Sequence, residues 1–342
     1  MAYTTINKSS DYFQTNLYTA NGSGKTISGM NFKPDFIWTK NRDDGNYIPA
    51  LVDAVRGGTK KLFTNGNTVE TTDTNAVTSF TSDGYVFGSS GSFNYGTDDY
   101  VNWCLKAGGG QGSSNTDGSI NTTYTSVNTT AGFSISSYTG TGSNATVGHG
   151  LSSKPSMIIV KNLSTAYEWG VYHKSLGATK NIYLDSSGGA GNATFWNNTE
   201  PTSSVFNVGS TDYTNGSGKN YIAYCFAEKT GYSKFGSYTG NGNADGSFCY
   251  LGFKPAFVMT KRTDGTGDWF IQDNKRLGYN YANYRLFANT GSAESTASRI
   301  DLLSNGFKCR DNDGNGNGFS YIYMAFAEAP LVGSNGVTAK AR

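Results

Sequence analysis

An acidic loop near the C-terminal end has the residue types and part of the spacing of a calcium site. Asp311, Asp313 and Asn315 occupy its first, third and fifth positions, and Gly316 occupies the sixth. The twelfth position is Ile322, where an EF-hand-type loop needs a bidentate glutamate, and no helical pattern flanks the segment. We therefore interpret the segment as a hairpin loop and expect no cofactor. Calcium bound by Asp311, Asp313 and Asn315 is the alternative.

Trp196 is the best candidate for direct contact with a ligand. It lies between Phe195 and Asn197 in a segment with the composition of a loop and no counterpart elsewhere in the chain. An indole ring combines a flat apolar face with a polar edge, which suits stacking on a sugar ring. Local packing is the alternative for Trp196. Trp169 and Trp269 occupy equivalent strand positions, so we expect them in the core.

The sequence offers little for catalysis. Its two histidines, His149 and His173, fit a turn residue and a surface residue better than members of a catalytic triad. Acid pairs such as Asp43–Asp44 and Asp98–Asp99 lie in loops and do not recur through the chain. Glycoside hydrolysis needs two carboxyl groups across a cleft. We therefore expect no enzymatic activity and no catalytic residue.

These side chains must be positioned by a unit that the chain contains three times. Each copy has a Lys-Pro pair followed by an apolar run, in residues 32–40, 153–161 and 253–261. Each copy closes with an apolar strand, in residues 100–105, 221–226 and 321–326. From proline to the fifth residue of the closing strand the distance is constant, as Pro34 to Cys104, Pro155 to Cys225 and Pro255 to Ala325 show. A constant length predicts one fold used three times.

The composition predicts short strands joined by tight turns. The 342 residues include 45 Gly, 23 Tyr and 20 Phe, and no segment has a long helical period. We expect an all-β chain of three tandem antiparallel β-sandwich repeats, each about 100 residues long and of jelly-roll or lectin type. The predicted boundaries are 1–107, 131–229 and 230–330 for the repeats, 108–130 for a linker rich in Gly, Ser and Thr, and 331–342 for a C-terminal tail. Because only the first junction has a linker, we expect the first repeat to be set apart.

Charge and cysteine content narrow the class of protein further. A net charge of +2 gives no general attraction to nucleic acid, and no apolar stretch is long enough to span a membrane. The N-terminal residues lack the pattern of a secretory signal. Cys104 and Cys225 are equivalent to Ala325, so they are interpreted as small buried residues. Cys249 and Cys309 are close enough in sequence to pair, but a reducing cytosol would keep them as thiols.

Several strings together resemble a known family. They are residues 115–120, 131–135, 138–142, 146–151, 53–57, 103–108 and 326–330. As a set they are similar to an uncharacterised family of marine-bacteriophage virion proteins, described as tail-fibre-like or lectin-like with a concanavalin-type sandwich. The family has no defined catalytic residues. Its Asp-x-x-Arg-Gly pattern is complete only at Asp53–Gly57, and we interpret it as a turn with a structural Asp–Arg contact.

The resemblance implies a structural protein of the virion that is assembled in the host cytoplasm. We expect a fibre-type or appendage-type adhesin that contacts the host surface through glycans, because aromatic loops on a rigid sandwich suit that task. A capsid decoration or cement protein is the alternative, and a glycan-degrading enzyme is a weaker one. The expected partners are other virion proteins, further copies of the chain in a homo-oligomer such as a trimer, and a host-surface glycan.

Overall fold

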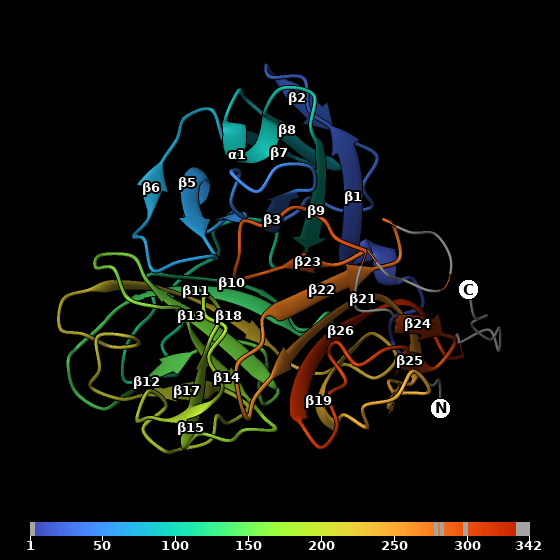
Figure 1. Cartoon of the computed structure of the whole chain (residues 1–342). Helices are drawn as coiled ribbons and strands as arrows, with labels where there is room; N and C mark the ends of the chain where they lie inside the picture. Colours follow the sequence, from blue (N-terminus) through green and yellow to red (C-terminus); the bar gives the residue numbers. More distant parts are fainter. Residues whose placement is uncertain (1–3, 277–279, 281–283, 297–299, 333–342) are drawn as a thin grey trace.

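Antiparallel β-sheets make up nearly all of the chain in the computed structural model, which describes residues 4–276, 280, 284–296 and 300–332 (Figure 1). The predicted all-β class is confirmed. The helical pieces among these residues are the short segments η1 (Ser9–Asp11) and α1 (Gly91–Asn94). No described helix is long and apolar enough to cross a membrane. Most of the predicted C-terminal tail lies outside the described residues.

Three larger sheets share one strand order. The first contains β1 (Phe13–Thr19), β9 (Asp99–Leu105), β3 (Phe36–Asn41), β4 (Ala50–Asp53), β5 (Gly57–Phe63) and β6 (Thr71–Thr72). The second contains β10 (Tyr124–Asn128), β11 (Phe133–Thr139), β18 (Asn220–Phe226), β13 (Met157–Asn162), β14 (Gly170–His173), β15 (Lys180–Tyr183) and β16 (Gly191–Asn192). The third contains β19 (Ser233–Thr239), β26 (Ser320–Pro330), β21 (Phe253–Arg262), β22 (Trp269–Asp273) and β23 (Leu286–Phe287). In each sheet the closing strand of the sequence repeat therefore lies beside the strand of the Lys-Pro segment.

Three smaller sheets accompany the larger ones. They are formed by β2 (Lys25–Ile27), β8 (Gly84–Phe87) and β7 (Val77–Thr81); by β12 (Ala145–Gly148) and β17 (Val205–Val208); and by β20 (Phe248–Tyr250), β25 (Gly306–Cys309) and β24 (Ile300–Leu303). Each smaller sheet packs on the larger sheet of its own repeat through a separate apolar cluster. The prediction that the apolar runs are buried on both faces is confirmed, because every residue of β3 and β13 is buried.

Each larger sheet packs one face on its smaller sheet. The opposite faces of the three larger sheets pack together in one shared hydrophobic core. Trp103, Tyr224 and Met324, at equivalent positions of the three closing strands, all belong to it. The expectation that the first repeat is set apart is therefore wrong. A longer connection adds little entropy cost to closure, whereas an uncovered apolar sheet face would remain in water. The requirement to bury that face decides the arrangement.

Residues 108–130, predicted to be a linker, contain ordered structure that belongs to the second repeat. Strand β10 pairs antiparallel with β11 along the edge of the larger sheet. Ser113 forms a bridge with Thr125, and Ile120 forms one with Val147 of β12. This segment therefore covers edge strands of both sheets in the second repeat.

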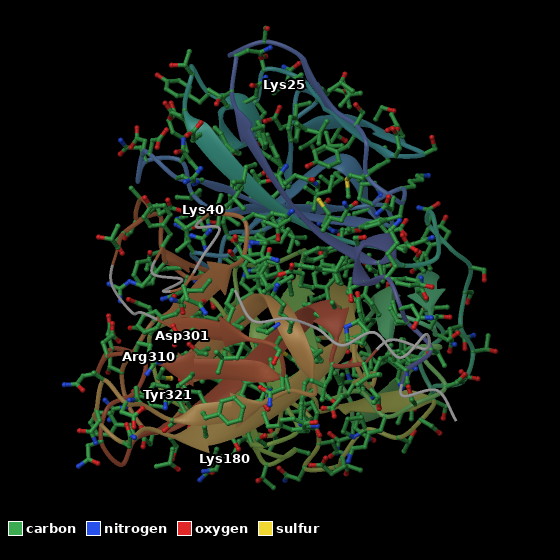
Figure 2. All side chains as sticks on the ribbon, turned by 90° about the vertical axis from the view of Figure 1, so that its right-hand side faces the viewer. Lys25, Lys40, Lys180, Asp301, Arg310 and Tyr321 are labelled. Atoms are coloured by element: carbon green, nitrogen blue, oxygen red, sulfur yellow. The ribbon has the colours of Figure 1, made fainter. Side chains whose placement is uncertain are left out.

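A buried lysine at the end of each Lys-Pro strand binds the backbone of another repeat. From Nζ, Lys40 donates to Thr290 O at 2.5 Å, Lys161 to Asn67 O at 2.8 Å and Lys261 to Gly188 O at 2.7 Å. Lys40 accordingly lies where the first repeat meets the third (Figure 2). The first repeat thus binds the third, the second binds the first and the third binds the second, which closes a ring of contacts.

A second ring of contacts is formed at the ends of β4, β14 and β22, the strands that follow the Lys-Pro strands in the sequence. Arg56 donates from Nε to Asp53 at 2.7 Å, as the interpretation of this turn predicts, and Arg276 donates to Asp273 at the same distance. In the second repeat, His173 occupies the position that Asp53 and Asp273 have in the other two repeats. Each of these three residues also meets the closing strand of another repeat: Tyr224 Oη donates to Asp53 at 2.7 Å, Trp103 Nε1 donates to Asp273 at 3.1 Å, and His173 Nε2 lies 3.2 Å from Tyr323 O. These groups are polar, but they serve the contacts between repeats.

Candidate functional site

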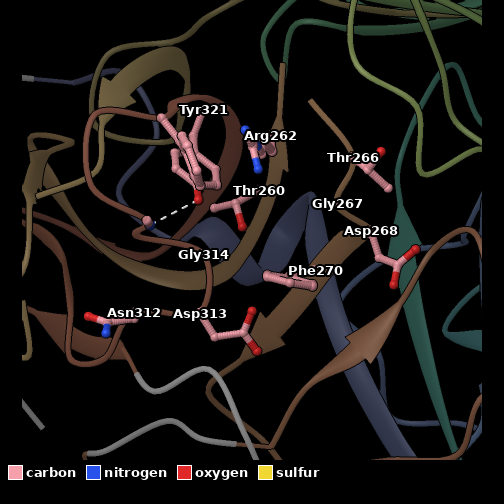
Figure 3. A pocket seen from close by; sticks show the side chains of 12 residues that line it. Thr260, Arg262, Thr266, Gly267, Asp268, Phe270, Asn312, Asp313, Gly314 and Tyr321 are labelled. Atoms are coloured by element: carbon pink, nitrogen blue, oxygen red, sulfur yellow. Dashed lines mark hydrogen bonds between the residues drawn. The ribbon is translucent and has the colours of Figure 1, made fainter. Parts of the chain in front are cut away.

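A pocket in the third repeat is the best candidate for a functional site (Figure 3). Its volume is about 190 Å³. Residues of β21, β22 and β26, of the loop before β22 and of the loop between β25 and β26 line it: Thr260, Arg262, Thr266, Gly267, Asp268, Phe270, Asn312, Asp313, Gly314, Gly316, Phe319 and Tyr321. Aromatic rings, carboxylates and one guanidinium therefore meet around a single cavity.

Asn315 holds the loop between β25 and β26 in place from inside. Its side chain is fully buried. Its Oδ1 accepts from Asn241 N at 3.2 Å and Ser247 N at 3.4 Å, while its Nδ2 donates to Asn241 Oδ1 at 2.9 Å and Asn243 O at 3.0 Å. The buried carboxamide thus has partners for both of its polar atoms, and it joins the loop to the segment that contains Asn241, Asn243 and Ser247.

Two stacked tyrosines complete this support. The rings of Tyr238 and Tyr321 lie 4.9 Å apart and are almost parallel. Tyr321 Oη accepts from Gly316 N at 3.0 Å, which is the dashed line in Figure 3, and Tyr238 Oη donates to Gly314 O at 2.5 Å. The loop that forms one side of the pocket is thus fixed on either side of Asn315.

The same support occurs in the other two repeats. Asn94 and Asn215 take the place of Asn315, and the stacked pairs are Tyr18 with Tyr100 and Tyr138 with Tyr221. Sequence reasoning missed this set. The signal was present, because an asparagine precedes the first tyrosine of each closing strand by the same number of residues.

One wall of the pocket pairs a cation with an aromatic ring. The guanidinium carbon of Arg262 lies 3.4 Å from the ring centre of Phe319, a close cation–π contact. Arg262 Nε also donates to Asp264 Oδ1 at 2.8 Å. Phe319 is 38% exposed. A Cβ on Gly316 would lie 2.4 Å from that ring, so the absence of a side chain at position 316 gives the ring its place.

The opposite wall combines Phe270 with two acids. Asp313 forms an ion pair with Arg285, whose guanidinium carbon also lies 5.0 Å from the ring centre of Phe270. Asp268 accepts from Asn289 Nδ2 at 2.7 Å. Both carboxylates are thus held by neighbouring groups, and both line the cavity.

The residues of the acidic loop, for which calcium binding was the alternative interpretation, have other roles. Asp313 and Asn315 are engaged as described, and Asp311 Oδ1 accepts from Asp313 N at 3.1 Å. Among the described residues, no group of three or more His, Cys, Asp or Glu side chains could hold a metal ion. The loop is also not a hairpin loop, because β25 and β26 lie in different sheets. It connects the smaller sheet of the third repeat to the larger one.

Trp196 is not exposed, so the expectation of surface contact with a ligand is wrong. Its side chain is 1% exposed and belongs to the core of the second repeat, where it packs edge-on against Tyr172 at 5.9 Å. The segment has the composition of a loop, but it folds over the apolar interior between the two sheets. Trp169 and Trp269 are buried in the shared core, as predicted.

Both histidines are buried, which corrects the prediction that His173 lies on the surface. Burial lowers the pKa of each imidazole to about 4. His149 Nδ1 accepts from Leu151 N at 3.1 Å, and His173 Nδ1 accepts from Ser175 N at 3.2 Å. Neutral, buried imidazoles of this kind are structural. The four cysteines are buried thiols without disulfide bonds, as predicted.

The pocket has the chemistry of a binding site for a small polar ring. Phe319 and Phe270 offer apolar surface, while Asp268, Asp313 and Asn312 offer oxygen atoms that accept hydrogen bonds from hydroxyl groups. The volume is below the roughly 300 Å³ at which pockets for drug-sized ligands begin. The cavity therefore suits a small ligand or one unit of a longer one.

Comparison with known proteins gives a family and no function. Residues 8–330 match a family described as a domain of unknown function, DUF7483, and the chain therefore belongs to that family. No curated protein matches the chain.

Proposed function

We propose that this member of the DUF7483 family is a non-enzymatic structural protein of a phage virion, an adhesin of the fibre or appendage type that binds a host-surface glycan. The pocket of Arg262, Phe270 and Phe319 is the observation that carries the binding function. The finer fold belongs to the same proposal: three tandem sandwich repeats of jelly-roll or lectin type, joined around one core. The virion itself rests on the sequence resemblance described above.

The composition of the pocket supports binding of a sugar. A pyranose has an apolar face that packs on an aromatic ring and hydroxyl groups that donate to carboxylates. Phe319 is fixed from one side by Arg262 and limited from another by Gly316, so little side-chain entropy is lost on binding. A preorganised aromatic surface beside acceptor oxygens is what such a ligand needs.

The first prediction concerns Phe319, tested in the full chain. We expect Phe319→Ala to weaken glycan binding at least about fivefold, since stacking on an aromatic ring contributes about 1 kcal/mol beyond the buried area. Binding is measured first on an array of bacterial surface polysaccharides and then by titration with the glycan that responds.

Phe248→Ala is the matched control, because Phe248 is 46% exposed on β20, in the smaller sheet of the same repeat. It should leave affinity unchanged. Equal loss of binding in both variants, or no bound glycan for the unmodified chain, would contradict a sugar site in this pocket.

A capsid decoration protein is the second candidate, favoured by one observation. Phe248 and Tyr250 project from the edge strand β20 with 46% and 49% exposure, and such a surface suits adhesion to a shell. Imaging of intact particles with an antibody against this chain separates the two functions. Label on the tail or on fibres supports the adhesin, whereas label spread over the head supports decoration.

A further inference from the structure

A lysine, an asparagine and a glutamate meet in the third repeat, and none of them lines the candidate pocket. Lys254 Nζ donates to Glu328 Oε1 at 3.2 Å, and Asn274 Nδ2 donates to Glu328 Oε2 at 2.6 Å. The amine and the carboxamide are therefore neighbours that share one carboxylate, each bound to a different oxygen. A nucleophilic amine, a carboxamide and a group that moves protons are what an amide bond between two side chains requires.

The pairing of β21 with β26 brings the three side chains together. Its register shifts between Lys254 and Pro255, so the two strands form a bulge at Glu328. A bulge changes the direction of a side chain, and bulges are frequent beside active sites. Asn274 directly follows β22, the other neighbour of β21, and its N donates to Ala256 O at 2.9 Å. Three adjacent elements thus hold the three side chains.

The other two repeats lack this combination. In the second repeat the glutamate is retained as Glu228, but Lys174 replaces the asparagine, and the two form an ion pair. In the first repeat both positions, 54 and 107, are alanine. The strand of the Lys-Pro segment also begins earlier in the third repeat, at Phe253, so that it includes the lysine. The carboxamide beside a Lys–Glu pair is therefore a feature of the third repeat.

Burial suits a reaction between these side chains. The side chain of Lys254 is 13% exposed and Asn274 is 4% exposed, so little water can compete with the amine. Asn274 Oδ1 is buried and has no hydrogen-bond partner among the described residues. A buried polar atom in this state is rare, and a role in a reaction is one of the reasons for it. A purely structural carboxamide would be expected to have partners for both of its polar atoms.

We propose that Lys254 and Asn274 react to form an intramolecular isopeptide bond, with Glu328 as the group that moves the protons. Glu328 takes a proton from the ammonium group of Lys254, and the neutral Nζ attacks Cγ of Asn274. In the tetrahedral intermediate, Glu328 gives its proton to Nδ2 and accepts one from Nζ. The bond between Cγ and Nδ2 then breaks, the carbonyl group re-forms, and the ammonia that leaves takes the proton from Glu328.

The products are one amide bond between Nζ and Cγ and one ammonium ion, so no oxidant or further reactant is needed. Asn274 and Glu328 also line a hollow of about 200 Å³, which gives the ammonium ion space to leave. Holding the amine beside the carboxamide makes the reaction effectively unimolecular, which accounts for a large part of the barrier. This inference is independent of the glycan site in the third repeat.

Intact-mass spectrometry of the full chain tests the proposal. We expect the unmodified chain to be lighter than its sequence by the mass of one ammonia, about 17 Da. Digestion with trypsin should yield residues 235–261 joined to residues 263–275, because these two peptides contain Lys254 and Asn274. A mass equal to that of the sequence would overturn the proposal. Loss of ammonia without the joined peptides, as in succinimide formation at an Asn-Gly pair, would overturn it too.

Two variants test the roles of the side chains. Lys254→Arg keeps a cation beside Glu328 but removes the amine, so the joined peptides should disappear. Glu328→Gln removes the group that moves the protons and should slow bond formation at least about a hundredfold. Glu228→Gln is the matched control, because Glu228 is the counterpart of Glu328 in the second repeat, and it should leave the joined peptides unchanged. Equal amounts of joined peptides in both glutamine variants would overturn the role of Glu328.

Discussion

At the scale of single residues, buried polar groups in this protein have structural roles. His149 and His173 each use Nδ1 as an acceptor for a backbone N–H two residues ahead, which leaves the proton on Nε2. Protonation of Nδ1 would break that bond and place a charge in the interior. The low pKa of both imidazoles follows from this burial.

The histidines predict a loss of stability in mild acid. In the unfolded chain an imidazole binds a proton near its ordinary pKa of 6.5, whereas in the folded chain it does so only near 4. The unfolded state therefore binds more protons between these values, and the free energy of unfolding falls as pH falls from about 6.5 to 4. Each histidine contributes on the order of 3 kcal/mol to this fall.

Urea unfolding at a series of pH values measures this effect. His149→Asn places an acceptor near the position of Nδ1 without the titration, so its stability should decline less between about pH 6.5 and 4. A variant with the same decline as the unmodified chain would assign the acid sensitivity to carboxylates instead.

At the scale of elements, the Asn–Tyr support is the device that shapes the loop before each closing strand. A single carboxamide satisfies donors and acceptors of two loops, and the stacked tyrosines fix the backbone on either side of it. The support is shared by all three repeats, whereas Arg262 and Phe319 occur together only in the third. The side chains near this loop thus differ between the repeats, whereas the Asn–Tyr support of the loop is the same in all three.

Asn215 allows a test of this support away from the candidate pocket. Asn215→Ala leaves Thr141 N and Ser143 O without their partner, so we expect a loss of about 1–3 kcal/mol in the free energy of unfolding. Asn192→Ala, at an exposed position of β16, should change it by less than about 0.5 kcal/mol. Thermal or urea unfolding compares the two, and equal stability would show that the loop holds without the carboxamide.

The elements were more predictable than their partners. The Lys-Pro runs and closing strands are read from local apolar residues, and β3 and β13 are buried as that pattern predicts. The sequence of a strand does not show which other segment covers its second face. The sequence analysis therefore did not predict the shared core. Trp196 was misplaced for a related reason, because loop composition does not reveal that the loop covers a core. The contact of Arg262 with Phe319 joins residues far apart in sequence, and it required the sheet topology.

At the scale of the whole molecule, the ring of buried lysines links the repeats and predicts a dependence on alkaline pH. Burial lowers the pKa of Lys40 to about 7 and those of Lys161 and Lys261 to about 8, from the ordinary value of 10.5. At pH values between the lowered pKa of each lysine and its ordinary pKa, the unfolded chain binds more protons than the folded chain. The free energy of unfolding therefore rises with pH in this window, by up to about 1.4 kcal/mol per pH unit for each lysine.

Lys261→Met tests this dependence, with stability measured between about pH 7 and 9.5. Methionine retains the apolar stem and removes the titrating group, so the rise with pH should be smaller by the share of one lysine. Lys308→Met, on β25 in the smaller sheet and outside the ring, should keep the full rise. An unchanged slope in Lys261→Met would contradict the assignment to the buried lysines.

The shared core also bears on the descent of the chain. Each larger sheet has an apolar face in the core that the three repeats share. A shorter ancestor with one repeat would have left that face in water unless three copies associated around an axis. The present chain is equivalent to such a trimer whose subunits have been joined end to end by peptide bonds. Fusion would then have freed each former subunit to diverge, which explains how one repeat could acquire a pocket and another an additional strand.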